Sequence, residues 1–136
     1  MSVRTYLLDT NVLLSAVIAP EWLAPEVREC LSSPNNRVYF SAASIWEIAI
    51  KRSLSQENFD FSPEDIHRLA LETWFSELTV QAEHCYALAS MPWLHRDPFD
   101  RLLIAQAQSL PAYLLTSDHL LDQYSDLVVR IVLNKA

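Results

Sequence analysis

The sequence predicts a single α/β domain in which about four to five parallel strands are covered by helices on both faces. Three observations lead to this fold class. Short apolar segments alternate with longer helical segments, which is the order that builds a parallel sheet. The apolar segments show no polar–apolar alternation, as expected for strands buried on both faces. The chain contains no repeat or linker, so residues 1–136 are expected to form one domain.

The first half of the chain predicts two strands, each followed by helical segments. Pro20 ends the first helical segment, because proline cannot continue a helix. Ser41 stands directly before the third one, where its hydroxyl can cap the free amides of the first turn. In chain order, these elements are a strand over 3–9, helices over 10–19 and 21–33, a turn over 34–36, a strand over 37–40 and a helix over 42–54.

The second half contains a strong helix start at Ser62, which is followed by Pro63 at the first helical position and then by two acids. That helix is expected to run to about residue 75. Residues 76–80 fit either a short strand or a turn. The remaining expected elements are helices over 82–91 and 98–109, a strand over 112–117, a helical turn over 119–124 and a strand over 127–133.

The composition excludes several classes of function. The net charge is −7, with 17 acidic and 10 basic residues, so bulk electrostatics cannot hold a nucleic acid, whereas a basic protein partner would suit this charge. The chain has no glycine, which excludes the glycine-rich loops that cradle nucleotide phosphates. Cys30 and Cys85 show neither zinc-site spacing nor a disulfide framework. Without a signal peptide or a membrane segment, the protein is expected to be cytoplasmic.

Two aspartates follow predicted strands. Asp9 ends the first strand, and Asp118 comes directly after the strand over 112–117. If the two strands are parallel and central, both carboxylates reach the same edge of the sheet, where sites form in open α/β folds. Each aspartate also has a plain structural explanation, because aspartate is a good cap at the start of a helix.

Glu47 is the only charged residue in the segment over 41–50, where apolar residues surround it on every helical face. A buried carboxylate without a partner costs several kcal/mol. Lys51, four residues later, could form an ion pair worth roughly 0.3–0.5 kcal/mol. The alternative is a bound cation that holds the carboxylate in place. The sequence leaves these two explanations equally open.

Residues 95–107 read HRDPFDRLLIAQA and place two acids in the first turn of an otherwise apolar helix. Asp97 precedes Pro98 and is therefore expected to cap the helix. Asp100 falls at the third helical position, and its side chain leans back towards the helix start. We expect Asp97 to cap the helix and Asp100 to reach into the site.

The four acids Asp9, Glu47, Asp100 and Asp118 would together form an all-oxygen cluster. Such ligands select Mg²⁺ or Mn²⁺ over zinc, and ions of this kind can promote phosphodiester cleavage. Basic residues close to the acids in sequence could contact phosphate locally, or could simply lie on solvated helix faces. These basic residues are Lys51, Arg52, Arg96 and Arg101.

Four segments resemble a known family, the PIN-domain proteins, and more narrowly the VapC-type toxins of bacterial toxin–antitoxin pairs. The segments are DTNVLL at 9–14, SAASIWEIAIKRSL at 41–54, HRDPFDRLLIAQA at 95–107 and LLTSD at 114–118. The resemblance spans nearly the whole chain, in order and at fitting spacing. It implies a PIN-like parallel sheet and a Mg²⁺- or Mn²⁺-dependent endoribonuclease that acts on RNA. It also implies a homodimer inhibited by a small cognate antitoxin.

By position, the resemblance places the family's four acids on Asp9, Glu47, Asp100 and Asp118. It gives auxiliary positions to Thr10, Asn11, Asp97, Arg101 and Thr116. The family commonly has glycine after the helix that bears the glutamate and before the strand that leads to the fourth acid, and this chain has none there. Two alternatives remain open: a PIN nuclease that processes RNA or DNA without an antitoxin, and an inactive PIN fold that serves as a binding protein.

Overall fold

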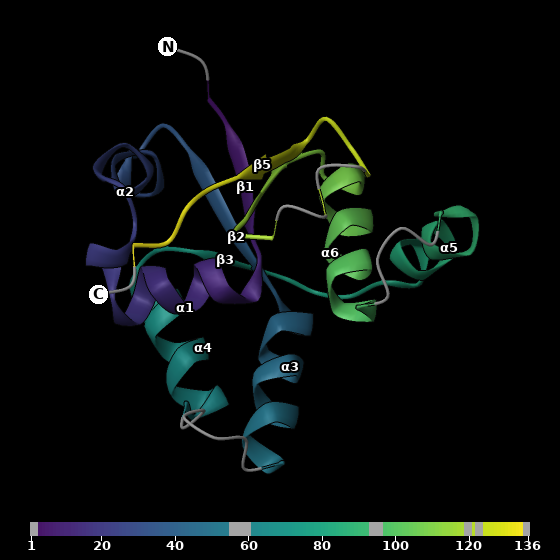
Figure 1. Ribbon diagram of the computed structural model, residues 1–136, viewed down its shortest axis with the longest axis horizontal. Coiled ribbons are helices and arrows are strands. Elements are labelled where there is room, and N and C mark those ends of the chain that lie inside the picture. The colour runs from purple at the N-terminus through teal and green to yellow at the C-terminus, as the bar shows by residue number, and fades with distance from the viewer. Residues whose placement is uncertain (1–2, 55–60, 93–96, 119–120, 122–123, 135–136) are drawn as a thin grey trace.

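The computed structural model describes residues 3–54, 61–92, 97–118, 121 and 124–134. Their core is a five-stranded sheet in the order β3-β2-β1-β4-β5, and every neighbouring pair is parallel, as predicted (Figure 1). The strands are β1 (Thr5–Leu8), β2 (Arg37–Ser41), β3 (Ser76–Leu78), β4 (Tyr113–Thr116) and β5 (Val128–Arg130). The central position of β1, between β2 and β4, brings the ends of three strands together.

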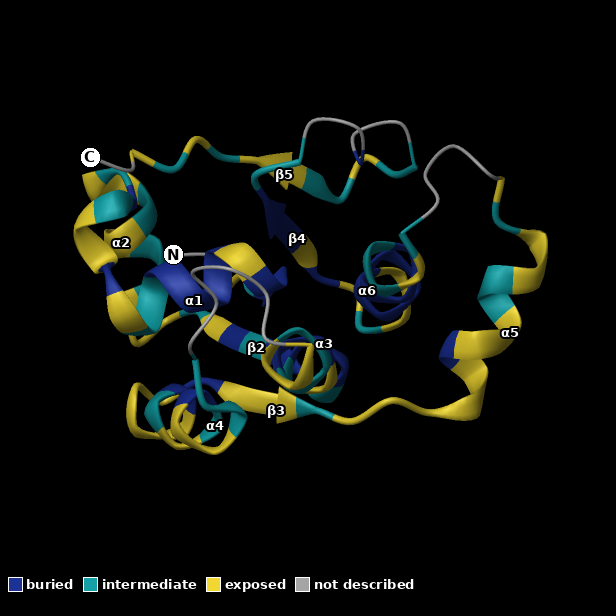
Figure 2. Ribbon diagram, turned by 60° about the horizontal axis from the view of Figure 1, so that its bottom comes forward, coloured by how far each residue is buried: buried dark blue, intermediate teal, exposed yellow. Residues whose placement is uncertain are grey.

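Helices cover both faces of this sheet, as the sequence predicts (Figure 1). One face carries α1 (Thr10–Ile18), α2 (Pro25–Ser32) and α4 (Pro63–Glu72), and the other carries α6 (Pro98–Ser109). The helix α5 (Ala82–Ser90) lies outside α6, so α6 is sandwiched between it and the sheet (Figure 2). This sandwich explains why residues 101–107 are buried on all sides of α6. The helix α3 (Ala42–Ser53) starts where β2 ends and contacts α1, α4 and α6.

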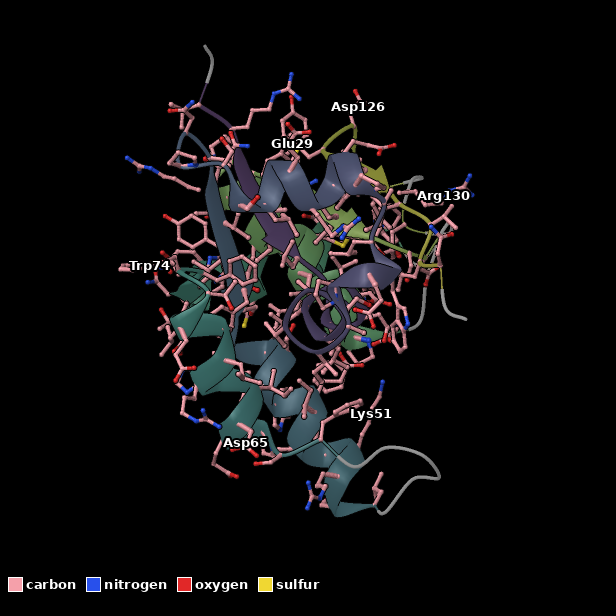
Figure 3. The ribbon with its side chains drawn as sticks, turned by 90° about the vertical axis from the view of Figure 1, so that its left-hand side faces the viewer. Glu29, Lys51, Asp65, Trp74, Asp126 and Arg130 are labelled. Carbon is pink, nitrogen blue, oxygen red and sulfur yellow. The ribbon has the colours of Figure 1, made fainter. Side chains whose placement is uncertain are left out.

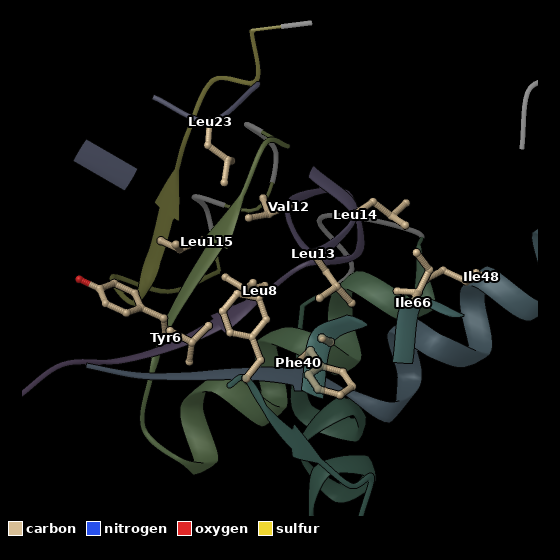
Figure 4. Packing of buried hydrophobic residues seen from close by; sticks show 13 residues of the cluster. Tyr6, Leu8, Val12, Leu13, Leu14, Leu23, Phe40, Ile48, Ile66 and Leu115 are labelled. Atoms are coloured by element: carbon tan, nitrogen blue, oxygen red, sulfur yellow. The ribbon is translucent and has the colours of Figure 1, made fainter. Parts of the chain in front are cut away.

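Alternate residues of β1 supply the two halves of the core. Tyr6 and Leu8 face α1 and α4 and pack with residues such as Leu13 and Phe40 (Figure 4). Leu7 faces the other way and packs against α6. These side chains are almost fully buried, as the continuous apolar strand runs predict.

Two predicted caps are confirmed. The Ser41 hydroxyl accepts a hydrogen bond from Ala43 N at 3.0 Å, and the Ser62 hydroxyl accepts one from Asp65 N at 3.3 Å. The single helix expected over 21–33 is wrong. The chain instead forms a short 3₁₀ helix, η1 (Pro20–Trp22), and then α2, which begins at Pro25. Proline favours the first position of a helix and disfavours helical backbone in the residue before it, so Pro25 starts a new helix.

The end of α4 shows how the chain turns without glycine. Trp74 has a φ of 72°, a left-handed conformation in which glycine is the usual residue. Phe75 N then donates to Ala70 O at 3.1 Å and closes the helix end. The backbone of Trp74 therefore carries strain that a glycine at this position would avoid.

The remaining expectations are met in part. Residues 76–80 contain the short strand β3, and the last strand is shorter than the expected 127–133. Most of the helical turn expected over 119–124 lies outside the described residues. In the part of the chain that the structure describes, no helix has the length and apolar character needed to cross a membrane.

Candidate active site

Three parallel strands deliver polar residues to one edge of the sheet. Leu8 of β1 pairs with Leu115 of β4, so the residues that follow these strands lie side by side. Asp9 comes directly after β1, and its backbone N donates to Leu115 O at 3.0 Å. The neighbouring strand β2 ends at Ser41, where α3 begins and carries Glu47 back over the same edge. Parallel pairing thus brings the predicted residues together.

Asp9 is buried, with 4% of its surface exposed, and caps α1. One carboxylate oxygen accepts from Val12 N at 2.8 Å, and the other accepts from the Thr116 hydroxyl at 2.5 Å. Burial raises the pKa of Asp9 to about 6; hydrogen bonds lower it, and the negative charge of Glu47 adds to the rise. Each carboxylate oxygen can accept more than one interaction, so Asp9 keeps capacity for a cation.

Glu47 is also buried and is held by two partners. The Thr10 hydroxyl donates to its Oε1 at 2.6 Å, and Lys51 Nζ lies 2.9 Å from its Oε2. The ion pair that the sequence offered as one explanation for Glu47 is therefore present. The Lys51 side chain remains 34% exposed, so its ammonium can also reach solvent. The pair does not exclude a cation at this carboxylate.

The two acids at the start of α6 have different surroundings. Asp97 caps the helix, and its Oδ1 accepts from Phe99 N at 2.9 Å, which confirms the predicted cap. Burial, followed by the negative charges of Asp97, Asp9 and Glu47, raises the pKa of Asp100 to about 8. Asp100 therefore lies close enough to the other carboxylates to be affected by their charge.

Thr116 connects Asp9 to the predicted fourth acid. Its hydroxyl donates to Asp9, and it accepts a hydrogen bond from the backbone N of Asp118 at 3.0 Å. The Asp118 backbone is thus placed beside the site through one shared hydroxyl. The residues immediately after it, including His119, lie outside the described part of the chain.

The other auxiliary positions differ in their surroundings. Asn11 is exposed at the start of α1. Arg101 is buried, with 5% exposed, and its guanidinium donates to Leu88 O and Met91 O at the end of α5, both at 3.3 Å. These contacts give Arg101 a structural role in holding α5 against α6. Its predicted neighbour in phosphate binding, Arg96, lies outside the described residues.

One site residue was missed in the sequence. Ser44 is 1% exposed, and its hydroxyl lies 3.0 Å from the Thr10 hydroxyl. It therefore supports the threonine that contacts Glu47. Its position three residues before Glu47 places both on one face of the helix, and this spacing could have identified it.

The donor set fits a hard divalent cation. The charge of Glu47 raises the pKa of Asp9, and the charges of Asp97, Asp9 and Glu47 raise that of Asp100, which is an environment that a cation would neutralise. Within residues 3–54, 61–92, 97–118, 121 and 124–134, no three His, Cys, Asp or Glu side chains already converge as a metal site. In this structure Thr116 holds the Asp9 carboxylate, and Thr10 and Lys51 hold that of Glu47.

Comparison with known proteins supports the same architecture. Residues 6–127 match the profile of the PIN domain family. A search of curated protein sequences finds no relative that matches this chain.

Three solved structures share the fold. One is the structure of VapBC2 from Rickettsia felis bound to a DNA fragment from the VapBC2 promoter. It gives a TM-score of 0.66 at 17% identity over 93% of this chain and 96% of the other. VapBC-1 from nontypeable Haemophilus influenzae gives 0.58 at 22% identity over 88% and 90%. A domain of a functionally unknown protein from Methanocaldococcus jannaschii DSM 2661 gives 0.55 at 16% identity over 87% and 81%. At these identities the likeness concerns the fold alone.

Proposed function

The chain belongs to the PIN domain family, a family of nucleases, and from this premise we propose that it is a metal-dependent endoribonuclease toxin neutralised by a cognate antitoxin. The proposal is supported by Asp9 and Glu47, which Thr116 and Thr10 hold at the carboxyl edge of the sheet, by their charges acting on Asp100, and by the Asp118 backbone beside Thr116. An inactive binding protein would have no use for these acids, because burial of Asp100 close to the charges of Asp97, Asp9 and Glu47 destabilises the fold.

The four carboxylates would hold Mg²⁺ or Mn²⁺, which supplies the positive charge that activates a water and stabilises the leaving oxygen in phosphodiester hydrolysis. The chain's own residues orient these ligands. Thr116 positions the Asp9 carboxylate, and Thr10, supported by Ser44, positions Glu47. Lys51 supplies the positive charge beside Glu47 in the absence of a metal, and its exposed side chain can move to a phosphate of the RNA.

The proposed partners are a small basic antitoxin and a second copy of the chain, in the cytoplasm. The net charge of −7 suits a basic partner. Two of the structural neighbours, from Rickettsia felis and Haemophilus influenzae, are VapBC assemblies. The alternative is a PIN nuclease that processes RNA or DNA without an antitoxin, and it differs from the toxin in having no neutralising partner.

The test is expression of the chain in bacteria with and without the small protein encoded beside it, followed by mapping of RNA ends. We expect growth arrest and new RNA ends that the small protein suppresses. In a purified assay, cleavage should require Mg²⁺ or Mn²⁺ and stop in excess EDTA. Undiminished cleavage in EDTA would contradict the metal mechanism, and cleavage without affinity for the small protein would favour the solitary nuclease.

A matched control comes from an acid at the other end of the strands. Asp126 is exposed and precedes β5, so it lies away from the carboxyl edge, and Figure 3 shows it far from Lys51. Asp126→Asn removes the same charge as Asp9→Asn. We expect full cleavage from the control variant and none from Asp9→Asn.

A further inference from the structure

An aromatic pair made of exposed Trp46 and half-buried Phe99 joins the helices α3 and α6. Trp46 of α3 is 59% exposed, an unusual exposure for so large an apolar side chain. Its ring packs edge-on against Phe99 of α6, with centroids 5.0 Å apart and an interplanar angle of 67°. The contact joins two helices that are separate in sequence.

Both members of the pair are next to the site's carboxylates in the chain. Trp46 directly precedes Glu47, and Phe99 lies between Asp97 and Asp100. The contact between the rings is therefore made by the two helices, α3 and α6, that carry Glu47 and Asp100. Phe99 also fixes the orientation of the indole, which reduces the entropy that Trp46 would lose on binding a ligand.

Single-stranded nucleic acids bind proteins through two means, basic grooves that follow the backbone and aromatic rings on which bases stack. This chain is acidic, and Lys51 beside the site is one positive charge and not a basic groove. Stacking is therefore the main means that the surface offers. Aromatic stacking accepts any base, because every base has a π-face.

We propose that Trp46, oriented by Phe99, is a stacking platform for an unpaired nucleobase next to the phosphate that the site cleaves. The inference rests on the proposed function and adds a residue that positions the RNA beside the cut. A base held in a helix cannot stack on the indole, so paired RNA is a poor ligand.

The test measures binding of a fluorescein-labelled single-stranded RNA of twelve nucleotides by anisotropy in Mg²⁺, on an Asp118→Asn background that should not cut it. Trp46→Ala should weaken binding roughly five- to 150-fold, the range for loss of one stacked base. Trp46→Phe should retain most of the affinity. A matched oligomer with abasic residues in place of nucleotides should bind weakly and show no dependence on Trp46.

Trp74→Ala is the matched control. Trp74 is 92% exposed and lies at the end of α4, and Figure 3 shows it well apart from Lys51 of α3. We expect this variant to bind RNA as the parent does. Melting curves of all variants verify that each is folded.

Three results would overturn the stacking platform. The first is binding of the oligomer by Trp46→Ala as tightly as by the parent, and the second is equally tight binding of the abasic and the normal oligomer. Light scattering that shows dissociation of a dimer by Trp46→Ala would instead assign this surface to a second copy of the chain. Failure of the unsubstituted protein to cleave any RNA would contradict the proposed nuclease, while the binding measurement would still decide the role of Trp46.

Discussion

The starts of α1 and α6 both present a capping aspartate to the candidate site, but they use it differently. At α1, Asp9 caps the helix, is buried beside the end of β4, and has its pKa raised by burial and by the charge of Glu47. At α6, Asp97 caps the helix and Asp100, three residues later, carries the raised pKa. The cap of α1 immediately follows the central strand β1, so one residue, Asp9, both caps the helix and lies at the candidate site. The start of α6 does not follow a strand directly, so the cap falls on Asp97 and the proposed site position on Asp100.

This comparison predicts that substitution of Asp9 should have the largest combined effect on cleavage and on the free energy of unfolding. Asp9→Asn and Asp9→Ala should both lower the cleavage rate more than about a hundredfold. Mutation of a residue that only hydrogen-bonds to a metal ligand already lowers activity about ten- to a hundredfold, and Asp9 is proposed to be a ligand itself. Asp9→Ala should also unfold more easily than Asp9→Asn, by roughly 2 kcal/mol, because it removes the cap and the acceptor of the buried Thr116 hydroxyl. Cleavage rates and urea unfolding check both parts. Equal stability of the two variants would show that Asp9 is not a structural cap.

At α6 the same two effects should separate. Asp100→Asn should abolish cleavage, because it removes the charge that a hard cation requires. It should leave the fold intact and raise the melting temperature in metal-free buffer, since it relieves repulsion from Asp97, Asp9 and Glu47. Asp97→Asn is the matched control and should keep cleavage. If Asp97→Asn is inactive and Asp100→Asn is active, the two roles are reversed.

The pH dependence of the free energy of unfolding should come from Asp9 and Asp100, the acids at the starts of α1 and α6. Burial raises the pKa of Asp9 from 3.8 to about 6 and that of Asp100 to about 8, so the folded chain holds these protons longer than the unfolded chain does. Metal-free stability should therefore fall as pH rises from about 4 to 8. The change in the pKa of Asp9 corresponds to roughly 3 kcal/mol.

Urea unfolding of the metal-free protein across this pH range measures the effect. Asp9→Asn and Asp100→Asn should each flatten the curve. Mn²⁺ should stabilise the protein more at pH 8 than at pH 5, where protons compete for the same carboxylates. Stability that rises with pH in EDTA would contradict the assigned environment of both acids.

The smallest effect is expected at the cap of α6. Asp97→Ala removes the hydrogen bond to Phe99 N and should cost roughly 0.5–2 kcal/mol, while some cleavage remains. Asp97→Asn should be nearly neutral for stability, because asparagine caps about as well as aspartate. Thermal melts of the two variants distinguish the lost cap from the lost charge. A large loss of stability in Asp97→Asn would show that the charge of Asp97, and not its cap, matters.

The sequence by itself determined the fold class, the parallel direction of the strands and the position of Asp9 at their carboxyl edge. These features depend on local signals, such as the apolar runs, the capping serines Ser41 and Ser62, and the Asp97–Pro98 helix start. The PIN-like fold that the resemblance implied is confirmed by the family match. Pro25 is also a local signal, because proline favours the start of a helix. The expectation of one helix over 21–33 is wrong because α2 begins at Pro25.

Only the tertiary structure decided how each acid is held. Asp9 and Thr116 are 107 residues apart in the chain and meet because β1 and β4 pair in one particular register. The contact of Thr10 with Glu47 and the burial of Arg101 beneath α5 likewise depend on how helices pack. Sequence spacing predicts neighbours within one helix, such as Lys51 and Glu47, because the helical repeat is constant. It does not predict contacts between elements, because these depend on strand register and side-chain packing across the whole core.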